Sequence, residues 1–160
     1  MKVLVTGMSG TGKSTALIEL GRRGYRVVDT DSTEWSEWVP LADDPVGEWL
    51  WREDRMVELL ASDDNRTLYV SGCTTSQVRF HDRFDAIVLL SAPADVLLDR
   101  VGARTTNDYG KGPGERERIL GHLATVEPLL REGATHEIDA SRPLAEVVDE
   151  LEAIGREPSA

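Results

Sequence analysis

The chain has 160 residues, a formal net charge of -11 and one cysteine, Cys73. Its length predicts a single domain spanning residues 1–160 around one core, and a lone cysteine excludes an internal disulfide. The acidic balance argues against non-specific binding to nucleic acid or anionic lipid, because such binding draws on clustered Lys and Arg. With no signal-peptide pattern and no long apolar run, we expect no membrane partner and a cytoplasmic address.

Predicted strands and helices alternate along the chain. Because such alternation is typical of parallel sheets joined by right-handed crossovers, we predict an α/β fold with helices on both faces of the sheet. The strands are expected at 2–5, 25–28, 68–71, 86–91 and 135–138, and the helices over 13–23, from 93, from 115 and over 144–154.

Residues 32–60 contain all four tryptophans and are interpreted as mainly helical. Pro40 and Pro45 would break this segment into at least two pieces, because proline disrupts a helix interior. The longer helix is expected over 47–60. At least two of the tryptophans are expected to lie in the core.

Residues 7–14 read Gly-Met-Ser-Gly-Thr-Gly-Lys-Ser. This is the P-loop pattern, in which glycines let successive backbone N–H groups face phosphate oxygens, the lysine reaches the outer phosphates and the serine hydroxyl binds Mg²⁺. The predicted strand before it and helix after it supply the expected context, since a helix N-terminus favours an anion. The residues expected to bind nucleotide are Gly7, Ser9, Gly10, Thr11, Gly12, Lys13, Ser14 and Thr15, with Lys13 also catalytic.

Further polar segments follow other predicted strands. Ligands of parallel α/β sheets bind at the carboxyl ends of the strands. We therefore expect the P-loop, 29–31, 72–75 and 91–93 to converge on one cleft.

Asp29 and Asp31 follow the second predicted strand at a spacing of two, so an extended backbone would point both carboxylates to the same side. We predict that Ser14 and Asp29 hold Mg²⁺, and that Asp31 accepts a proton from an acceptor hydroxyl or orients it. The alternative is that Asp31 or Ser32 caps a following helix.

Arg100 and Arg104 lie one helical turn apart, at the start of a glycine-rich segment, about 104–118, that is expected to form a lid. Phosphoryl transfer spreads negative charge over the migrating group, and a cation carried by a closing loop stabilises it. Arg104 is therefore predicted to be catalytic.

The acceptor side is assigned to the tryptophan-rich segment, about 32–62, because it follows Asp29 and Asp31 directly. Arg52, Arg55 and Arg79 are candidates to bind an acceptor carboxylate or phosphate. The alternative is that they form surface ion pairs. The partners in that alternative are Glu48, Glu53 and Asp54.

With these elements assembled, the chain resembles the nucleoside monophosphate kinase and shikimate kinase-like group of P-loop phosphotransferases. The resemblance is carried by residues 7–15, by Asp29-Thr30-Asp31, by 98–104 (Leu-Asp-Arg-Val-Gly-Ala-Arg) and by 138–143 (Ile-Asp-Ala-Ser-Arg-Pro). It implies a three-layer fold with a five-stranded parallel sheet in the order 2-3-1-4-5, and ATP with Mg²⁺ as phosphoryl donor. The resemblance further places Arg100 against the adenine, Arg104 on the phosphates and the backbone of Ala140, Ser141 and Arg142 around the base.

Two features depart from the shikimate kinase pattern. The glycine triplet after the third strand is here Gly72-Cys73-Thr74, and no arginine stands where the shikimate carboxylate pattern would place one. The leading hypothesis is therefore an ATP-dependent kinase that phosphorylates a hydroxyl of a small-molecule acceptor not identified by the sequence. The alternatives are a nucleoside monophosphate kinase and an ATP-binding regulatory module.

Overall fold

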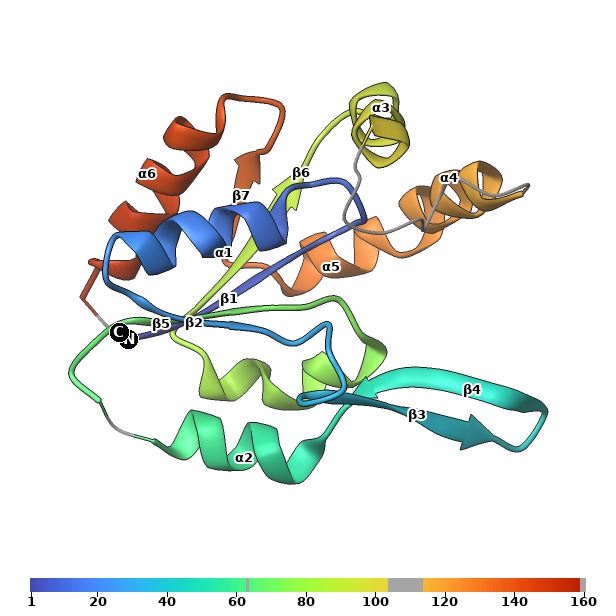
Figure 1. Cartoon of the computed structure of the whole chain (residues 1–160), viewed down its shortest axis with the longest axis horizontal. Helices are drawn as coiled ribbons and strands as arrows, with labels where there is room; N and C mark the ends of the chain where they lie inside the picture. Colours follow the sequence, from blue (N-terminus) through green and yellow to red (C-terminus); the bar gives the residue numbers. More distant parts are fainter. Residues whose placement is uncertain (63, 104–113, 159–160) are drawn as a thin grey trace.

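A computed structural model of the chain describes residues 1–62, 64–103 and 114–158. Its centre is a five-stranded parallel sheet in the order β2-β5-β1-β6-β7 (Figure 1). Counted along the chain within this sheet, that order is second, third, first, fourth and fifth, as the resemblance implied. The strands are β1 Lys2–Gly7, β2 Arg26–Asp29, β5 Leu68–Ser71, β6 Ala86–Ser91 and β7 His136–Asp139.

Helices cover both faces of the sheet, which confirms the predicted α/β class (Figure 1). One face is covered by α1 (Lys13–Arg22) and α6 (Leu144–Gly155), and the other by α2 (Glu53–Ala61) and the 3₁₀ helix η1 (Thr75–Arg83). The remaining helices are α3 Ala94–Ala103, α4 Glu115–Thr125 and α5 Glu127–Gly133.

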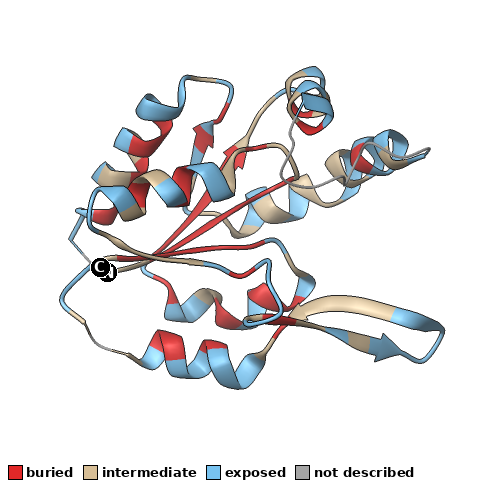
Figure 2. Ribbon diagram, viewed as in Figure 1, coloured by how far each residue is buried: buried red, intermediate tan, exposed pale blue. Residues whose placement is uncertain are grey.

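Strand β1 supplies both halves of the core because its side chains alternate between the two faces. Val3 and Val5 pack with residues of α1 and α6, whereas Leu4 packs with residues of α2 and η1. All three side chains are fully buried, and Figure 2 shows the buried residues concentrated in the sheet and on the helix faces turned toward it. A strand buried on both faces reads as a continuous apolar run, which explains why β1 was predictable.

The predicted helical structure between the second and third strands of the sheet is wrong for most of that segment. The chain forms an antiparallel hairpin of β3 (Ser36–Leu41) and β4 (Asp44–Trp51), and of the residues described in this segment only those of α2 (Glu53–Ala61) are helical. In the hairpin Trp38 lies opposite Trp49, an aromatic cross-strand pair of the kind that stabilises sheets.

Gly47 shows why a helix over 47–60 does not form. Its φ is +79°, and a Cβ there would lie 2.1 Å from the carbonyl oxygen of Val39 on the partner strand. The ladder register shifts between Val39 and Leu41, so Gly47 lets β4 bend where the pairing is irregular.

Candidate functional site

The P-loop follows β1 and leads directly into α1. Gly10 has a φ of +89°, and a Cβ there would lie 2.9 Å from the carbonyl oxygen of Leu97, so the loop packs too closely against α3 for a larger residue. Thr11 Oγ1 donates to the carbonyl of Met8 at 2.9 Å and closes the turn. Gly12, which has no side chain, is the N-cap of α1, so the first N–H groups of this helix are left for an anion.

Lys13 lies across this loop. Its Nζ donates to the carbonyl oxygens of Gly7 at 2.7 Å and Met8 at 3.1 Å. The ammonium is therefore held at the loop that the sequence assigns to phosphate, a short movement of a flexible side chain away from an anion seated there.

Ser14 and Asp29 meet at the carboxyl edge of the sheet. Ser14 Oγ donates to Asp29 Oδ2 at 2.6 Å, and the N–H of Asp31 donates to Asp29 Oδ1 at 3.0 Å. A hydroxyl and a carboxylate are the oxygen ligands that Mg²⁺ takes beside substrate phosphates. Within residues 1–62, 64–103 and 114–158, no three His, Cys, Asp or Glu side chains gather as a candidate metal cluster. The two oxygens of Ser14 and Asp29 fit a metal whose other ligands come from phosphate and water.

Asp31 stands beside Asp29 and contacts the hairpin. Both carboxylates are exposed and the intervening Thr30 is buried, as expected from the spacing of two. Trp49 Nε1 donates to Asp31 Oδ1 at 3.1 Å. The alternative role of Asp31 as a helix cap is wrong, because the next regular element is β3.

Thr30 anchors this aspartate pair in the core. Its Oγ1 donates to the carbonyl of Ser71 at 2.7 Å and accepts from Trp51 Nε1 at 2.8 Å, while its own carbonyl accepts from Ser36 Oγ at 2.6 Å. A Cβ on Gly72 would lie 2.4 Å from Thr30 Oγ1. The sequence analysis missed this role of Thr30, although the buried middle position of Asp-Thr-Asp was a usable signal.

Gln77 is a second buried residue that the sequence analysis missed. Its Nε2 donates to Thr6 Oγ1 near the end of β1 at 3.1 Å, and its Oε1 accepts from the N–H of Thr74 at 3.1 Å. Gln77 thereby fixes the turn after β5 to the strand that leads into the P-loop. No sequence pattern marks such a contact, because 71 residues separate Gln77 from Thr6.

The residues predicted to surround the nucleotide base lie after β7 and on α3. Arg100 Nη1 donates to the carbonyl of Gly10 at 3.4 Å, and the N–H of Ala140 donates to the carbonyl of Ser91 at 2.7 Å. The pKa of Asp139 is lowered by hydrogen bonds from Ser141 Oγ and its N–H, and then by the positive charges of Arg142 and Arg100. Arg100 and the loop after β7 thus share one charged neighbourhood beside the P-loop.

Arg104 and residues 104–113 of the predicted lid lie outside the described residues. The remainder of that segment, 114–118, is the N-cap and first turn of α4.

The three candidate acceptor arginines each meet a glutamate. Arg52 Nη1 lies 2.7 Å from Glu37 Oε2, and Arg55 Nη1 lies 3.7 Å from Glu34 Oε1. Arg79 pairs with Glu53, one of the partners named in the ion-pair alternative. Their role toward an acceptor stays a prediction.

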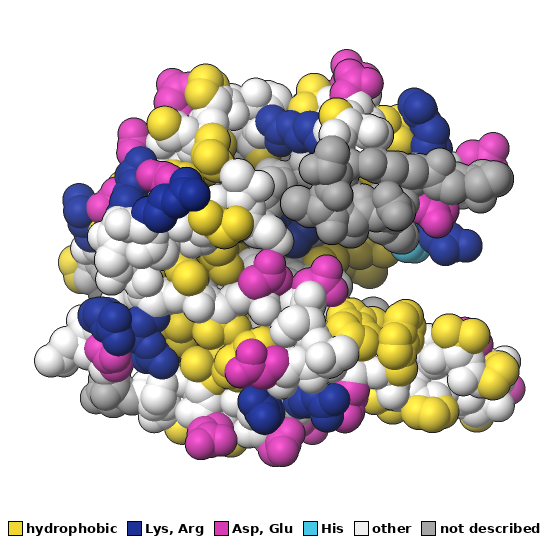
Figure 3. Space-filling model, viewed as in Figure 1, with side chains coloured by type: hydrophobic (Ala, Val, Ile, Leu, Met, Phe, Trp, Pro, Cys, Tyr) yellow, Lys and Arg dark blue, Asp and Glu magenta, His cyan; other side chains and the backbone are white. Residues whose placement is uncertain are grey.

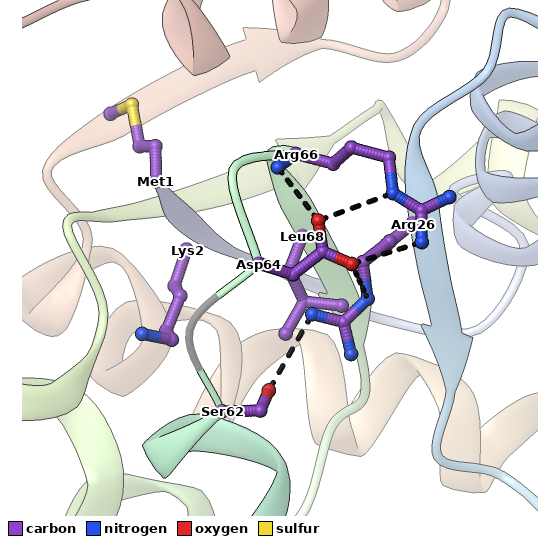
Figure 4. A pocket seen from close by; sticks show the side chains of 7 residues that line it. All are labelled: Met1, Lys2, Arg26, Ser62, Asp64, Arg66 and Leu68. Atoms are coloured by element: carbon purple, nitrogen blue, oxygen red, sulfur yellow. Dashed lines mark hydrogen bonds and ion pairs between the residues drawn. The ribbon is translucent and has the colours of Figure 1, made fainter.

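Two hollows lie away from the P-loop. Met1, Lys2, Arg26, Ser62, Asp64, Arg66 and Leu68 line a cavity of about 30 Å³ at the amino ends of the strands, where Asp64 bonds Arg66 (Figure 4). That volume holds little more than a water molecule. A shallow hollow of about 300 Å³ lies between β2 and α2, lined by Arg26, Trp35, Arg55, Glu58, Leu59 and Ser62.

The hairpin borders the carboxyl edge of the sheet. Figure 3 shows hydrophobic side chains gathered over the hairpin, beside a hollow that separates it from the part of the molecule carrying α4. The ends of β2, β5 and β6 lie beside the P-loop, as the contacts of Ser14 with Asp29, Thr30 with Ser71, and Gly7 with Leu90 show. That 72–75 and 91–93 line one cleft with them stays a prediction. No helix of the described residues is long and apolar enough to cross a membrane.

Comparisons with known proteins agree with this arrangement. Shikimate kinase 2 of Yersinia enterocolitica is 29% identical over 163 residues, covering 93% of this chain and 92% of the relative. A shikimate kinase from Acinetobacter baumannii, solved with shikimate, has a TM-score of 0.67 at 20% identity and covers 96% of this chain and 91% of its own. A gluconokinase from Sinorhizobium meliloti 1021 has a TM-score of 0.60 at 25% identity, with coverages of 95% and 89%.

These similarities confirm the resemblance to shikimate kinase-like P-loop kinases. The AAA domain family matches residues 3–121, which are more than half of the sequence and include the P-loop and both aspartates. The chain therefore belongs to the AAA domain family, as a P-loop member similar to the shikimate kinases.

Proposed function

We propose that this P-loop small-molecule kinase transfers the γ-phosphoryl group of ATP to a hydroxyl of its acceptor. The observation that carries the proposal is the hydrogen bond of 2.6 Å between Ser14 of the P-loop and Asp29, with Asp31 beside them at the same edge of the sheet. These contacts support a donor side at the P-loop with the acceptor side next to it.

Each group has a task in the proposed reaction. The N–H groups of the P-loop and Lys13 hold the phosphates, and Arg100 with the loop at 140–142 borders the base. Mg²⁺, held by Ser14 and Asp29, would neutralise charge on the phosphates. Arg104 is assigned to the transferred group, because a cation there stabilises the charge that spreads over it.

Asp31 is assigned as the group that accepts the proton. The acceptor O–H bond breaks, its proton passes to the Asp31 carboxylate, and the freed oxygen forms a bond to the γ-phosphorus. The bond from that phosphorus to the bridging oxygen breaks, and ADP leaves with the electron pair. Asp31 is exposed and stands beside Asp29, which supports this assignment.

The relatives suggest the size and type of the acceptor. The similar proteins are named after shikimate and gluconate, which are small hydroxylated acids. An acceptor of that size, rather than a protein or nucleic acid, is proposed for this chain.

The experiment is an acceptor panel that follows ADP release from ATP and Mg²⁺. We expect ADP release to rise with at least one polyhydroxylated acceptor, and Asp31→Asn to lower kcat by about 10²- to 10⁴-fold while the Kd for ATP stays near that of the wild type. Asp54→Asn, an exposed carboxylate change on α2, is the matched control. Unchanged turnover in Asp31→Asn would remove the proposed role, and a response to nucleoside monophosphates alone would indicate a nucleotide kinase.

A further inference from the structure

The hairpin presents a pair of indole rings on the face turned toward the sheet edge. Residues opposite each other in a ladder share a face, and so do residues two apart along one strand. Trp38 and Trp49 therefore lie on the same face as Ser36 and Trp51. Ser36 and Trp51 are buried and bond to Thr30 between the two aspartates. The face that carries the indole pair is therefore the one anchored beside the aspartates.

The inner ring of this pair touches the proposed catalytic carboxylate. Trp49 Nε1 donates to Asp31 Oδ1 at 3.1 Å. The ring centroids of Trp38 and Trp49 lie 5.3 Å apart with the planes tilted by 55°, and Trp38 is 60% exposed. The two rings therefore offer an apolar surface next to the carboxylate that an acceptor hydroxyl would approach.

The charges around the rings are unfavourable for an anionic acceptor. Within the described part of the chain, Arg52, Arg55 and Arg79 are each paired with a glutamate, which cancels the charge they would offer a carboxylate. The carboxylate of Asp31, which accepts from Trp49 Nε1, and that of Asp29 beside it add negative charge next to the rings. A carboxylate placed here would meet like charges, which is costly.

We propose that the acceptor is an uncharged saturated polyol, a sugar or a cyclic or open-chain polyalcohol, packed against Trp38 and Trp49. This inference rests on the proposed phosphoryl transfer and narrows its acceptor class. The C–H groups of such a skeleton carry small positive partial charges that suit the negative face of an indole.

The two indoles have separable tasks. Trp38 supplies contact area only, so its removal weakens acceptor binding. Trp49 supplies contact area and also holds the Asp31 carboxylate through its N–H, which makes it a positioning residue for the transfer. A split between KM and kcat distinguishes the two.

The first test compares matched acceptors that differ in one carboxylate, namely glucitol with gluconate and glucose with glucuronate. Initial rates of ADP release with ATP and Mg²⁺ give kcat/KM for each. We expect the uncharged member of at least one pair to be preferred by about tenfold or more.

The second test uses variants of the hairpin. Trp38→Ala is expected to raise the KM of the preferred acceptor about tenfold with kcat nearly unchanged, and Trp38→Phe to restore most of that loss. Trp49→Phe is expected to lower kcat about tenfold or more with a smaller change in KM, because the ring stays and the N–H is lost. Val46→Ala, a change at a 67% exposed apolar residue of β4, is the control and should leave both constants unchanged.

Several outcomes would overturn the inference while leaving phosphoryl transfer in place. These are a preference for gluconate or glucuronate, a preference for nucleosides over polyols, or a KM in Trp38→Ala equal to that in Val46→Ala. The absence of acceptor-dependent ADP release with every compound would overturn the transfer proposal as well.

Discussion

Ser14 Oγ and Asp29 Oδ2 lie 2.6 Å apart, although one residue lies in the first turn of α1 and the other ends β2. The contact joins two segments that the sequence separates by 15 positions. Because both oxygens are ligand types that Mg²⁺ prefers, a metal at this point would need little rearrangement of the chain. This contact therefore supports the proposed metal site between the phosphate loop and the aspartate pair.

Asp29→Asn should weaken the response to Mg²⁺. An amide oxygen carries no full charge, so we expect the Mg²⁺ concentration for half-maximal ADP release to rise about tenfold or more. The measurement is a titration of MgCl₂ at fixed ATP, with Asp54→Asn as the control. An unchanged titration midpoint would show that Asp29 does not contribute to the metal site.

Gly72→Ala should destabilise the fold and lower activity together. The added Cβ would lie 2.4 Å from Thr30 Oγ1 and 3.0 Å from Trp51 Nε1, both buried, so we expect a loss of about 1–3 kcal/mol in the free energy of unfolding. Because Thr30 stands between Asp29 and Asp31, kcat should fall as well.

Gly121→Ala is the matched control for Gly72→Ala. Gly121 lies inside α4, and a Cβ there meets no atom of the described residues within 4 Å. We expect the free energy of unfolding to rise by about 0.5–1 kcal/mol, because alanine favours a helix over glycine, with no change in kcat. Urea unfolding curves of both variants measure the difference. Equal stabilities in the two variants would contradict the close packing at Gly72.

The parts of the site that depend on local patterns could be predicted from the sequence. The P-loop is a fixed spacing, the strands of the sheet are short apolar runs, and the side on which Asp29 and Asp31 lie follows from the alternation of an extended chain. The order of the strands was implied by the family resemblance and is the order found in the sheet. The comparisons confirm the resemblance itself.

The hairpin and its contacts could not be predicted in the same way. The tryptophans in 32–51 are compatible with a buried helix or with a pair of strands. The strand pair forms because Trp38 pairs with Trp49 and because the backbone at Gly47 has a positive φ. The hydrogen bonds of Trp49 with Asp31 and of Gln77 with Thr6 join residues 18 and 71 positions apart. Such contacts depend on the assembled fold and leave no local pattern.

His81 should make the fold less stable in mild acid. Its Nε2 is buried without a hydrogen-bond partner among the described residues, and burial lowers its pKa. Below about pH 6.5 the unfolded chain therefore binds a proton that the folded chain does not. The stabilising contribution is present above that pH and is lost as the pH falls toward the lowered pKa.

The measurement is the free energy of unfolding from urea curves at pH 7.5, 6.5 and 5.5. His81→Leu should lose less stability over this range than the wild type, whereas His122→Leu on α4 retains His81 and should follow the wild type. Parallel pH curves for wild type and His81→Leu would show that this imidazole does not contribute.

A variant of Arg52 tests whether the acceptor-side arginines bind an anionic acceptor or only form surface ion pairs. It pairs with Glu37 at 2.7 Å and its Nε donates to the carbonyl of Thr33 at 3.0 Å. If the pair only ties β3 to the start of α2, Arg52→Ala and Glu37→Gln should each lower the free energy of unfolding by about 1 kcal/mol or less, and neither should change the KM of the acceptor. If Arg52 binds an anionic acceptor, Arg52→Ala alone should raise that KM. We expect the first result, since an arginine already neutralised by a glutamate offers little to a carboxylate.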